Sequence, residues 1–216
     1  MTVISNFFKY IIGFFAEGTG NYALSILIVT VLIKLVLAPF SVGQVRMSET
    51  MKRIQPLQKE LQEKYKDDPK EMQIRMSELY KENNVKFLSS CLGSLLPLPF
   101  LIIMYRVFIN VDFTAELAGR GVHIGFLWVS SLAVADPIIL PLISSLTTFL
   151  SFKQTQADKS QAGMTYIMPI VFFFITRTLP AGAALYWVIS NIISFGQTYL
   201  IKAYLKAREN KRSAIK

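Results

Sequence analysis

Residues Tyr22–Phe40 read YALSILIVTVLIKLVLAPF, nineteen consecutive residues of which only Lys34 is charged. A helix of this length measures about 28 Å, close to the hydrocarbon thickness of a bilayer. The composition agrees, because 52% of the 216 residues are hydrophobic and only 17% are charged. A soluble chain of this size buries only about 70% of the area that its unfolded chain exposes, too little to hide so much apolar surface. The sequence therefore predicts an integral membrane protein.

Four further apolar stretches raise the predicted number of transmembrane helices to five. They are Cys91–Ile109, Pro137–Phe152, Ala162–Thr176 and Ala183–Ile201. The third and fourth spans are short, which a membrane accommodates where the bilayer thins or where neighbouring helices shield the ends. The expected fold class is an all-α integral membrane protein whose five-span core occupies residues 21–203.

Basic residues are concentrated on one side of these spans. The segments 41–87, 153–163 and 202–216 hold 18 of the 23 Lys and Arg residues. Since cytoplasmic segments carry the excess of positive charge in membrane proteins, we expect the N-terminus outside and the C-terminus in the cytoplasm. Residues 41–87 interleave ten basic with eight acidic side chains. This mixture is typical of a solvated surface rather than of a nucleic-acid groove.

Residues 1–20 are predicted to form an amphipathic helix on the extracytoplasmic membrane surface. Their apolar residues recur at helical spacing, with Ser5, Asn6 and Lys9 between them. An uncleaved signal-like segment is the alternative interpretation.

The segment 41–87 is predicted to form a cytoplasmic helical hairpin. Helical periodicity lies on both sides of a turn at Lys66-Asp67-Asp68. Asp68 and Pro69 are typical of a helix cap and first helical residue, and Pro56 predicts a kink or a new helix start before the turn. Residues 204–216 are expected to form a basic cytoplasmic tail that binds anionic lipid or ribosomal RNA.

Lys34 is the unusual residue of the first span. It lies about two-thirds of the way along it, where a lysine costs roughly 2.5–3.5 kcal/mol. Snorkelling past Phe40 is the simpler interpretation, but that end is about 9 Å away along the helix, farther than the side chain reaches. The five spans contain no Asp or Glu that would pair with the lysine. We therefore predict a water-filled cavity at Lys34, with Thr30 on the same helix face.

Polar residues at helical spacing in two other spans support this cavity. They are Ser144, Thr148 and Ser151 in the third span, and Trp187, Ser190, Asn191, Ser194 and Thr198 in the fifth. Small hydroxyl residues also serve as packing contacts between membrane helices, which is the alternative for each of them taken alone.

The sequence offers no basis for enzyme, metal or cofactor chemistry. It lacks a glycine-rich phosphate loop, paired carboxylates and a Ser/His/Asp or Cys/His set. A single Cys91 and a single His123 exclude a disulfide framework and a Cys-x-x-Cys zinc site within the chain. We expect both residues to be structural.

The chain resembles the YidC family of membrane-protein insertases. The resemblance covers residues 22–202 and is carried by four ordered stretches. They are SILIVTVLIKLVLAPF (25–40), IQPLQKELQEKYKDDP (54–69), DPIILPLISSLTTFL (136–150) and LPAGAALYWVISNIISFGQTYLIK (179–202). The short bacterial form of that family has five spans, an outside N-terminus, a cytoplasmic helical hairpin and a basic C-terminal tail.

The resemblance implies a hydrophilic groove that is open to the cytoplasm and to lipid and closed on the outside. Lys34 stands where the family usually has an arginine, and Thr30 matches a polar groove position on the same helix. Trp187 matches the aromatic residue of the last span, and Ser151 falls where many members have glutamine. With Asn191, these residues are the predicted substrate-binding groove. Residues 86–99 depart from the family's pattern in the second span.

The resemblance also implies a function. The chain is expected to insert nascent membrane proteins into the bacterial plasma membrane and to help them fold, without a cofactor and without catalysis. Its expected partners are these substrates, membrane lipids, and the Sec translocon and ribosome, but not DNA. The alternatives are a small transporter or channel with Lys34 as its ion site, and a scaffold that binds other membrane complexes. The first is disfavoured because the five spans show no internal repeat.

Overall fold

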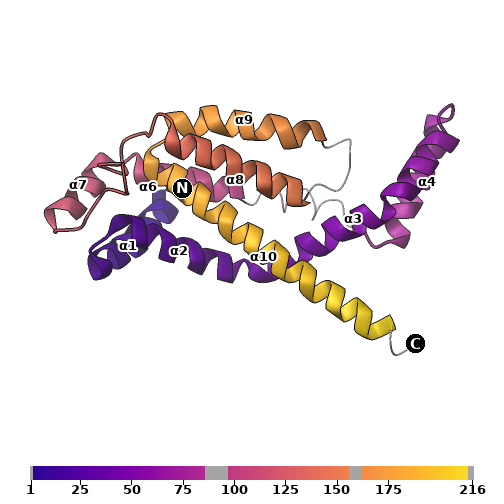
Figure 1. Cartoon of the computed structure of the whole chain (residues 1–216), viewed down its shortest axis with the longest axis horizontal. Coiled ribbons are helices and arrows are strands. Elements are labelled where there is room, and N and C mark those ends of the chain that lie inside the picture. The colour runs from indigo at the N-terminus through magenta and orange to yellow at the C-terminus, as the bar shows by residue number, and fades with distance from the viewer. Residues whose placement is uncertain (1, 86–96, 156–161, 214–216) are drawn as a thin grey trace.

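The computed structural model describes residues 2–85, 97–155 and 162–213, and these parts are helical except for turns and loops (Figure 1). The all-α fold class is confirmed, since the described residues form no β-strand. The helices are α1 (Thr2–Thr19), α2 (Tyr22–Val36), α3 (Ala38–Lys64), α4 (Pro69–Glu82), α6 (Pro97–Phe108), α7 (Val111–Gly119), α8 (Ile139–Thr155), α9 (Ala162–Thr178) and α10 (Ala181–Ser213). Cys91 and the predicted start of the second span lie outside the described residues.

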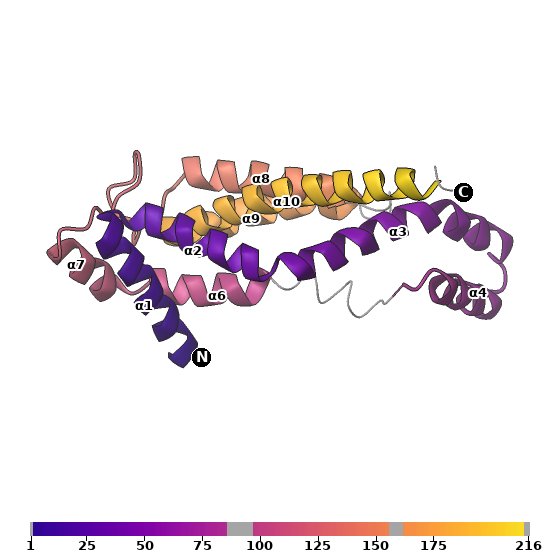
Figure 2. The ribbon, with the colours of Figure 1, turned by 90° about the horizontal axis from the view of Figure 1, so that it is seen from below.

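The helices that occupy the predicted spans run beside one another. They are α2, α6, α8, α9 and the first part of α10, and α10 packs against both α2 and α8 (Figures 1 and 2). By length and hydropathy, none of the described helices alone meets the measure of a membrane span. The pair α2 and α3 meets it together, with a bend of 64° between them.

The first predicted span is wrong at its C-terminal end. α2 ends at Val36 rather than at Phe40, and α3 begins at Ala38 after the bend at Leu37. Pro39 lies in the first turn of α3, where its missing N–H is tolerated, whereas its ring would clash with a carbonyl of a continuing helix. Lys34 therefore lies in the last turn of α2, closer to a helix end than the sequence suggested.

α3 and α4 occupy the predicted hairpin segment and project from one end of the bundle (Figure 2). The carboxylate of Asp68 accepts hydrogen bonds from the backbone N–H groups of Lys70 at 3.1 Å and Glu71 at 3.0 Å, as its predicted cap role requires. Ile54 and Leu79 are buried. α3 continues through Pro56, so the predicted new helix start does not occur.

The hydrophobic core lies at the opposite end, beside α7 (Figures 1 and 2). Tyr22 from the start of α2 and Phe108 from the end of α6 are fully buried there. The loop after α7 joins this core, because the backbone N–H of His123 donates to the Gly20 carbonyl at 2.8 Å and its carbonyl accepts from Tyr22 N–H at 2.9 Å. His123 thus joins this loop to the start of α2 through its backbone, while its side chain is exposed.

α1 forms a helix in the segment that was predicted to be amphipathic. The face with Phe8, Ile12 and Ala16 is buried, and the helix packs mainly against α2 and α6. The opposite face is also largely apolar, with Phe7 and Phe14 exposed. A second apolar face agrees with a lipid-facing position, which stays a prediction.

Asp136 fixes the start of α8. Its Oδ1 accepts from the backbone N–H groups of Ile138 at 2.8 Å and Ile139 at 2.9 Å, and the indole of Trp128 donates to Oδ2. Burial alone raises the pKa of Asp136, but these hydrogen bonds outweigh it and hold the pKa below its ordinary value of 3.8. The charged carboxylate therefore stabilises the fold.

We predict that Asp136→Asn lowers the free energy of unfolding at neutral pH. It should also reduce the further loss of stability on acidification. A carboxyl with a depressed folded pKa contributes stability above its unfolded pKa, and this is lost as the pH falls through the folded pKa. The variant should lose up to about 1 kcal/mol at pH 7, because asparagine keeps an oxygen that accepts from the backbone but loses the negative charge at the helix start. Thermal unfolding in detergent from neutral pH to below pH 3.8 measures both effects. Equal losses on acidification in the two chains would contradict the prediction.

Candidate functional site

Lys34 binds a hydroxyl group of another helix. Its Nζ donates to Ser194 Oγ at 2.7 Å, which joins the last turn of α2 to the middle of α10. The Gln197 side chain donates to the backbone carbonyl of Lys34 at 3.3 Å. Lys34 is half-buried, and within the described parts of the chain its ammonium forms no ion pair. The structure therefore holds this cation in place without neutralising it.

A second polar contact joins α10 to α8. The indole N–H of Trp187 donates to Thr148 Oγ1 at 2.9 Å, and the Asn191 amide donates to the same oxygen at 3.2 Å. Trp187 also stacks on Phe172 of α9, with the ring centroids 4.3 Å apart. The indole is buried between three helices, so it positions Thr148, whereas Asn191 is half-buried.

Thr30 lies one turn from Lys34 on α2, and Ser151 lies one turn from Thr148 on α8. Thr30 precedes Lys34 by one turn and is buried, and its hydroxyl donates to the Ile26 carbonyl of its own helix at 2.6 Å. Ser151 follows Thr148 by one turn on α8 and is half-buried. The structure thus brings Trp187 and Asn191 of α10 together at Thr148 of α8, and Ser194 of α10 binds Lys34 of α2. Thr30 and Ser151 lie beside these residues in sequence. We call Thr30, Lys34, Thr148, Ser151, Trp187, Asn191 and Ser194 the polar set.

The polar set begins where the core ends. Residues 181–188 at the start of α10 are all buried. Beyond them, polar side chains recur along α10 towards the end of the bundle that carries α3 and α4. They are Asn191, Ser194, Gln197, Thr198 and Lys202. The α7 end therefore holds the apolar core, and polar side chains of α10 become more frequent towards the other end.

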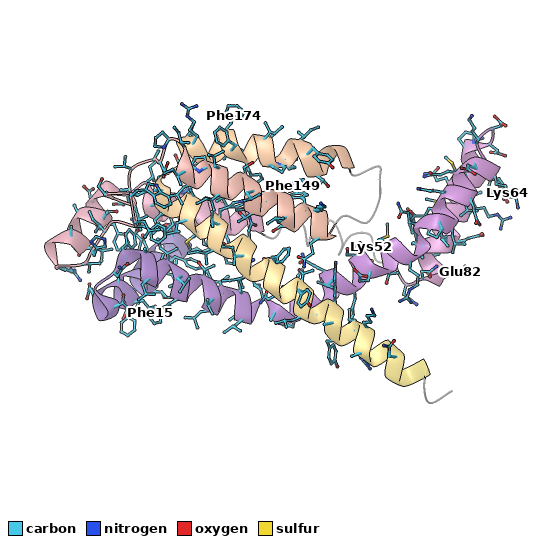
Figure 3. The ribbon with its side chains drawn as sticks, viewed as in Figure 1. Phe15, Lys52, Lys64, Glu82, Phe149 and Phe174 are labelled. Carbon is cyan, nitrogen blue, oxygen red and sulfur yellow. The ribbon has the colours of Figure 1, made fainter. Side chains whose placement is uncertain are left out.

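The outer faces of α8 and α9 are apolar and exposed. Phe174 points away from the bundle in Figure 3 and is 60% exposed. Further exposed apolar side chains on these two helices are Leu142, Leu146, Leu150, Ile167 and Ile170. Contiguous apolar surface of this kind marks a contact with a membrane or with another protein.

Sequence reasoning missed several polar contacts. Thr147 and Gln197 take part in the hydrogen bonds of Asn191 and Lys34. The spacing of Trp187, Asn191, Ser194 and Thr198 also continues four residues further to Lys202, which would have extended the stripe. In the described part of the chain, no group of three or more His, Cys, Asp or Glu side chains is placed to hold a metal ion.

Comparisons with known proteins agree on one family. The family model of the 60Kd inner membrane protein matches residues 14–209. A membrane protein insertase YidC of Caldanaerobacter subterraneus subsp. tengcongensis is 36% identical over 201 residues, covering 93% of this chain and 94% of the relative. Membrane protein insertase YidC 2 of Listeria innocua is 40% identical over 203 residues, covering 89% of this chain and 67% of the relative.

A solved structure shares the fold. It is the crystal structure of an active YidC insertase with the first transmembrane domain resolved, and it matches with a TM-score of 0.72 at 24% identity. The match covers 91% of this chain and 46% of that protein, so the chain spans less than half of its length. On the family model and the two sequence relatives, the chain belongs to the 60Kd inner membrane protein family, together with the YidC membrane protein insertases.

Proposed function

We propose that the chain inserts nascent membrane proteins into the bacterial inner membrane, using the polar faces of α2, α8 and α10 as a groove. The observation that carries this proposal is the state of Lys34, a half-buried ammonium that Ser194 holds while no ion pair neutralises it among the described residues. The family relationship supports the function, since the sequence relatives are membrane protein insertases.

The groove lowers the cost of moving polar groups across the membrane. An unsatisfied polar group in hydrocarbon costs several kcal/mol. The Asn191 amide and the hydroxyls of α8 offer hydrogen bonds, and Lys34 offers a positive charge to an acidic substrate residue. A polar segment that enters the groove exchanges water for these groups, so no chemical energy source is required.

The groove opens towards the cytoplasm in this proposal. The buried core and the loop that carries His123 close the α7 end, which we assign to the outside. The end with α3 and α4 carries most of the basic residues and faces the cytoplasm. The membrane is crossed five times, with the N-terminus outside and α1 lying at the outer surface.

The apolar part of the substrate leaves the groove along lipid. The exposed faces of α8 and α9 supply an apolar path beside the polar set. α2 has 15 residues and α8 has 17, so these helices measure about 22 Å and about 25 Å. Both are shorter than the roughly 30 Å of a hydrocarbon core. A bilayer that thins around them shortens the distance that the substrate crosses.

The proposed partners follow from the two ends of the molecule. Nascent membrane proteins are the substrates, and the Sec translocon and ribosome act with the chain on some of them. The basic end of α10 holds Lys202, Lys206 and Arg208. It attracts anionic lipid by about 1 kcal/mol per charge.

Insertion into lipid vesicles that contain only this chain tests the proposed function. A labelled single-span protein with a short acidic N-terminal tail should become protected from protease in these vesicles and not in empty ones. A small transporter or channel would instead produce ion or solute flux without protection of the substrate. Flux without insertion would therefore contradict the proposal.

A further inference from the structure

Two lysines and one glutamate meet where α3 passes the C-terminal end of α8 and the second half of α10. Lys52 and Glu49 belong to α3, and Figure 3 shows Lys52 on the part of α3 nearest α10. Lys202 Nζ lies 3.3 Å from Glu49 Oε1 and donates to the backbone carbonyl of Gln154 at 2.8 Å. Lys52 Nζ lies 3.6 Å from the same Glu49 oxygen and 3.4 Å from the same carbonyl. We call these four residues the α3–α10 junction.

The junction carries more positive than negative charge. Two ammonium groups share one carboxylate oxygen and one neutral carbonyl, which leaves one positive charge uncompensated within the junction. The lysine side chains are accessible to a ligand, since 34% of Lys52 and 26% of Lys202 is exposed. Burial, and then the neighbouring Lys202 ammonium, hold the pKa of Lys52 below its ordinary value despite Glu49. A second carboxylate would relieve this repulsion.

The junction lies on the path that leads to Lys34. Lys202 follows Ser194, the partner of Lys34, by eight residues on α10, or about 12 Å along the helix. It also continues the spacing of the polar α10 residues. The Gln154 side chain donates to the Phe195 carbonyl at 3.2 Å, which ties the end of α8 to α10 beside the junction.

We propose that Lys52 and Lys202 form a second carboxylate-binding site at the cytoplasmic mouth of the groove, which receives an acidic substrate residue before Lys34 does. This inference rests on the proposed insertase function. The incoming carboxylate binds the two ammonium groups in place of the Gln154 carbonyl. Glu49 holds the lysines in position and lowers the net charge, so the substrate binds weakly enough to move on to Lys34.

The test combines lysine variants with two substrates whose tails have the same length but differ in charge. Photo-crosslinking from the tail measures capture at the groove mouth, and protease protection measures insertion. Capture and insertion of an acidic-tailed substrate should fall in Lys52→Gln and in Lys202→Gln. In the double variant both should fall about fivefold or more. A substrate whose tail Asp residues are replaced by Asn should be unaffected. Glu49→Gln should increase capture of the acidic tail.

Two matched controls keep the inference open to contradiction. Lys59→Gln removes an exposed positive charge of α3, two turns beyond Lys52, and should change neither capture nor insertion. Lys202→Arg keeps the charge and should retain capture. An equal loss for acidic and neutral tails would show that the junction only holds α3 against α10, and would overturn the site, as would unchanged capture in the double variant. Failure of the unsubstituted chain to insert either substrate would overturn the proposed function and, with it, this site.

Discussion

Lys34→Glu should reduce insertion of a single-span substrate with an acidic tail by at least about tenfold, whereas Lys34→Arg should support it. Two unit charges about 4 Å apart interact by about 4 kcal/mol at the effective dielectric of a protein surface, and each 1.4 kcal/mol is roughly a factor of ten. Glutamate turns this attraction into repulsion. Arginine keeps the charge and adds a planar fork that binds a carboxylate through two hydrogen bonds. The protease-protected fraction in vesicles measures the effect.

Substrate charge and a distant lysine provide the controls for this prediction. A substrate with an uncharged tail should be inserted nearly equally by the Lys34→Glu and unsubstituted chains. Lys59→Glu makes the same charge change on an exposed side chain of α3 and should leave insertion of the acidic-tailed substrate intact. Full insertion of that substrate by the Lys34→Glu chain would show that the charge of Lys34 is not required for insertion, and would contradict the proposed mechanism.

Gly182→Ala should destabilise the bundle by about 2–3 kcal/mol, at the upper end for an overpacked core. A Cβ atom at this position would lie 2.5 Å from Cδ1 and 2.9 Å from Cγ of Phe108. The Phe108 ring is fully buried and packs against Tyr22, with the centroids 5.8 Å apart, so it has no free space to move into. The Gly182 N–H donates to the Leu132 carbonyl at 2.8 Å, which also holds the backbone in place.

Gly196→Ala is the matched control, because it adds the same methyl group to the same helix. A Cβ atom there meets nothing within 4 Å. Since alanine is a better helix former than glycine, this variant should gain up to about 1 kcal/mol. Unfolding of the two variants in detergent compares them directly. Equal stability of the Gly182 and Gly196 variants would contradict the close packing of α10 on Phe108.

Hydrophobic patterning was enough to predict most helices, because each one has to bury or shield an apolar face. The Asp68-Pro69 pair predicted the start of α4 correctly, since capping is a local property of the sequence. Pro39 and Pro56 show the limit. Both are prolines within apolar or amphipathic periodicity, yet the chain bends before Pro39 and α3 continues through Pro56. Tertiary contacts decide between these outcomes.

Helical spacing alone was enough to place some of the candidate side chains on a common face. Thr148, Trp187 and Asn191 were on predicted polar faces, and they meet as expected of α8 and α10. The pairing of Lys34 with Ser194 depends on how α2 packs on α10, which no local pattern contains. The α3–α10 junction was not predictable either, because half of its contacts involve the backbone carbonyl of Gln154.

The most direct test of the central claim is a charge swap between the groove and its substrate. Vesicles without a membrane potential would contain the Lys34→Glu chain, and the substrate's acidic tail would be replaced by a basic tail of equal length. If Lys34 acts by pairing with substrate charge, the Lys34→Glu chain should insert the basic-tailed substrate well and the acidic-tailed substrate poorly. Equal insertion of both tails by the Lys34→Glu chain, or failure of the basic tail to restore it, would contradict the account.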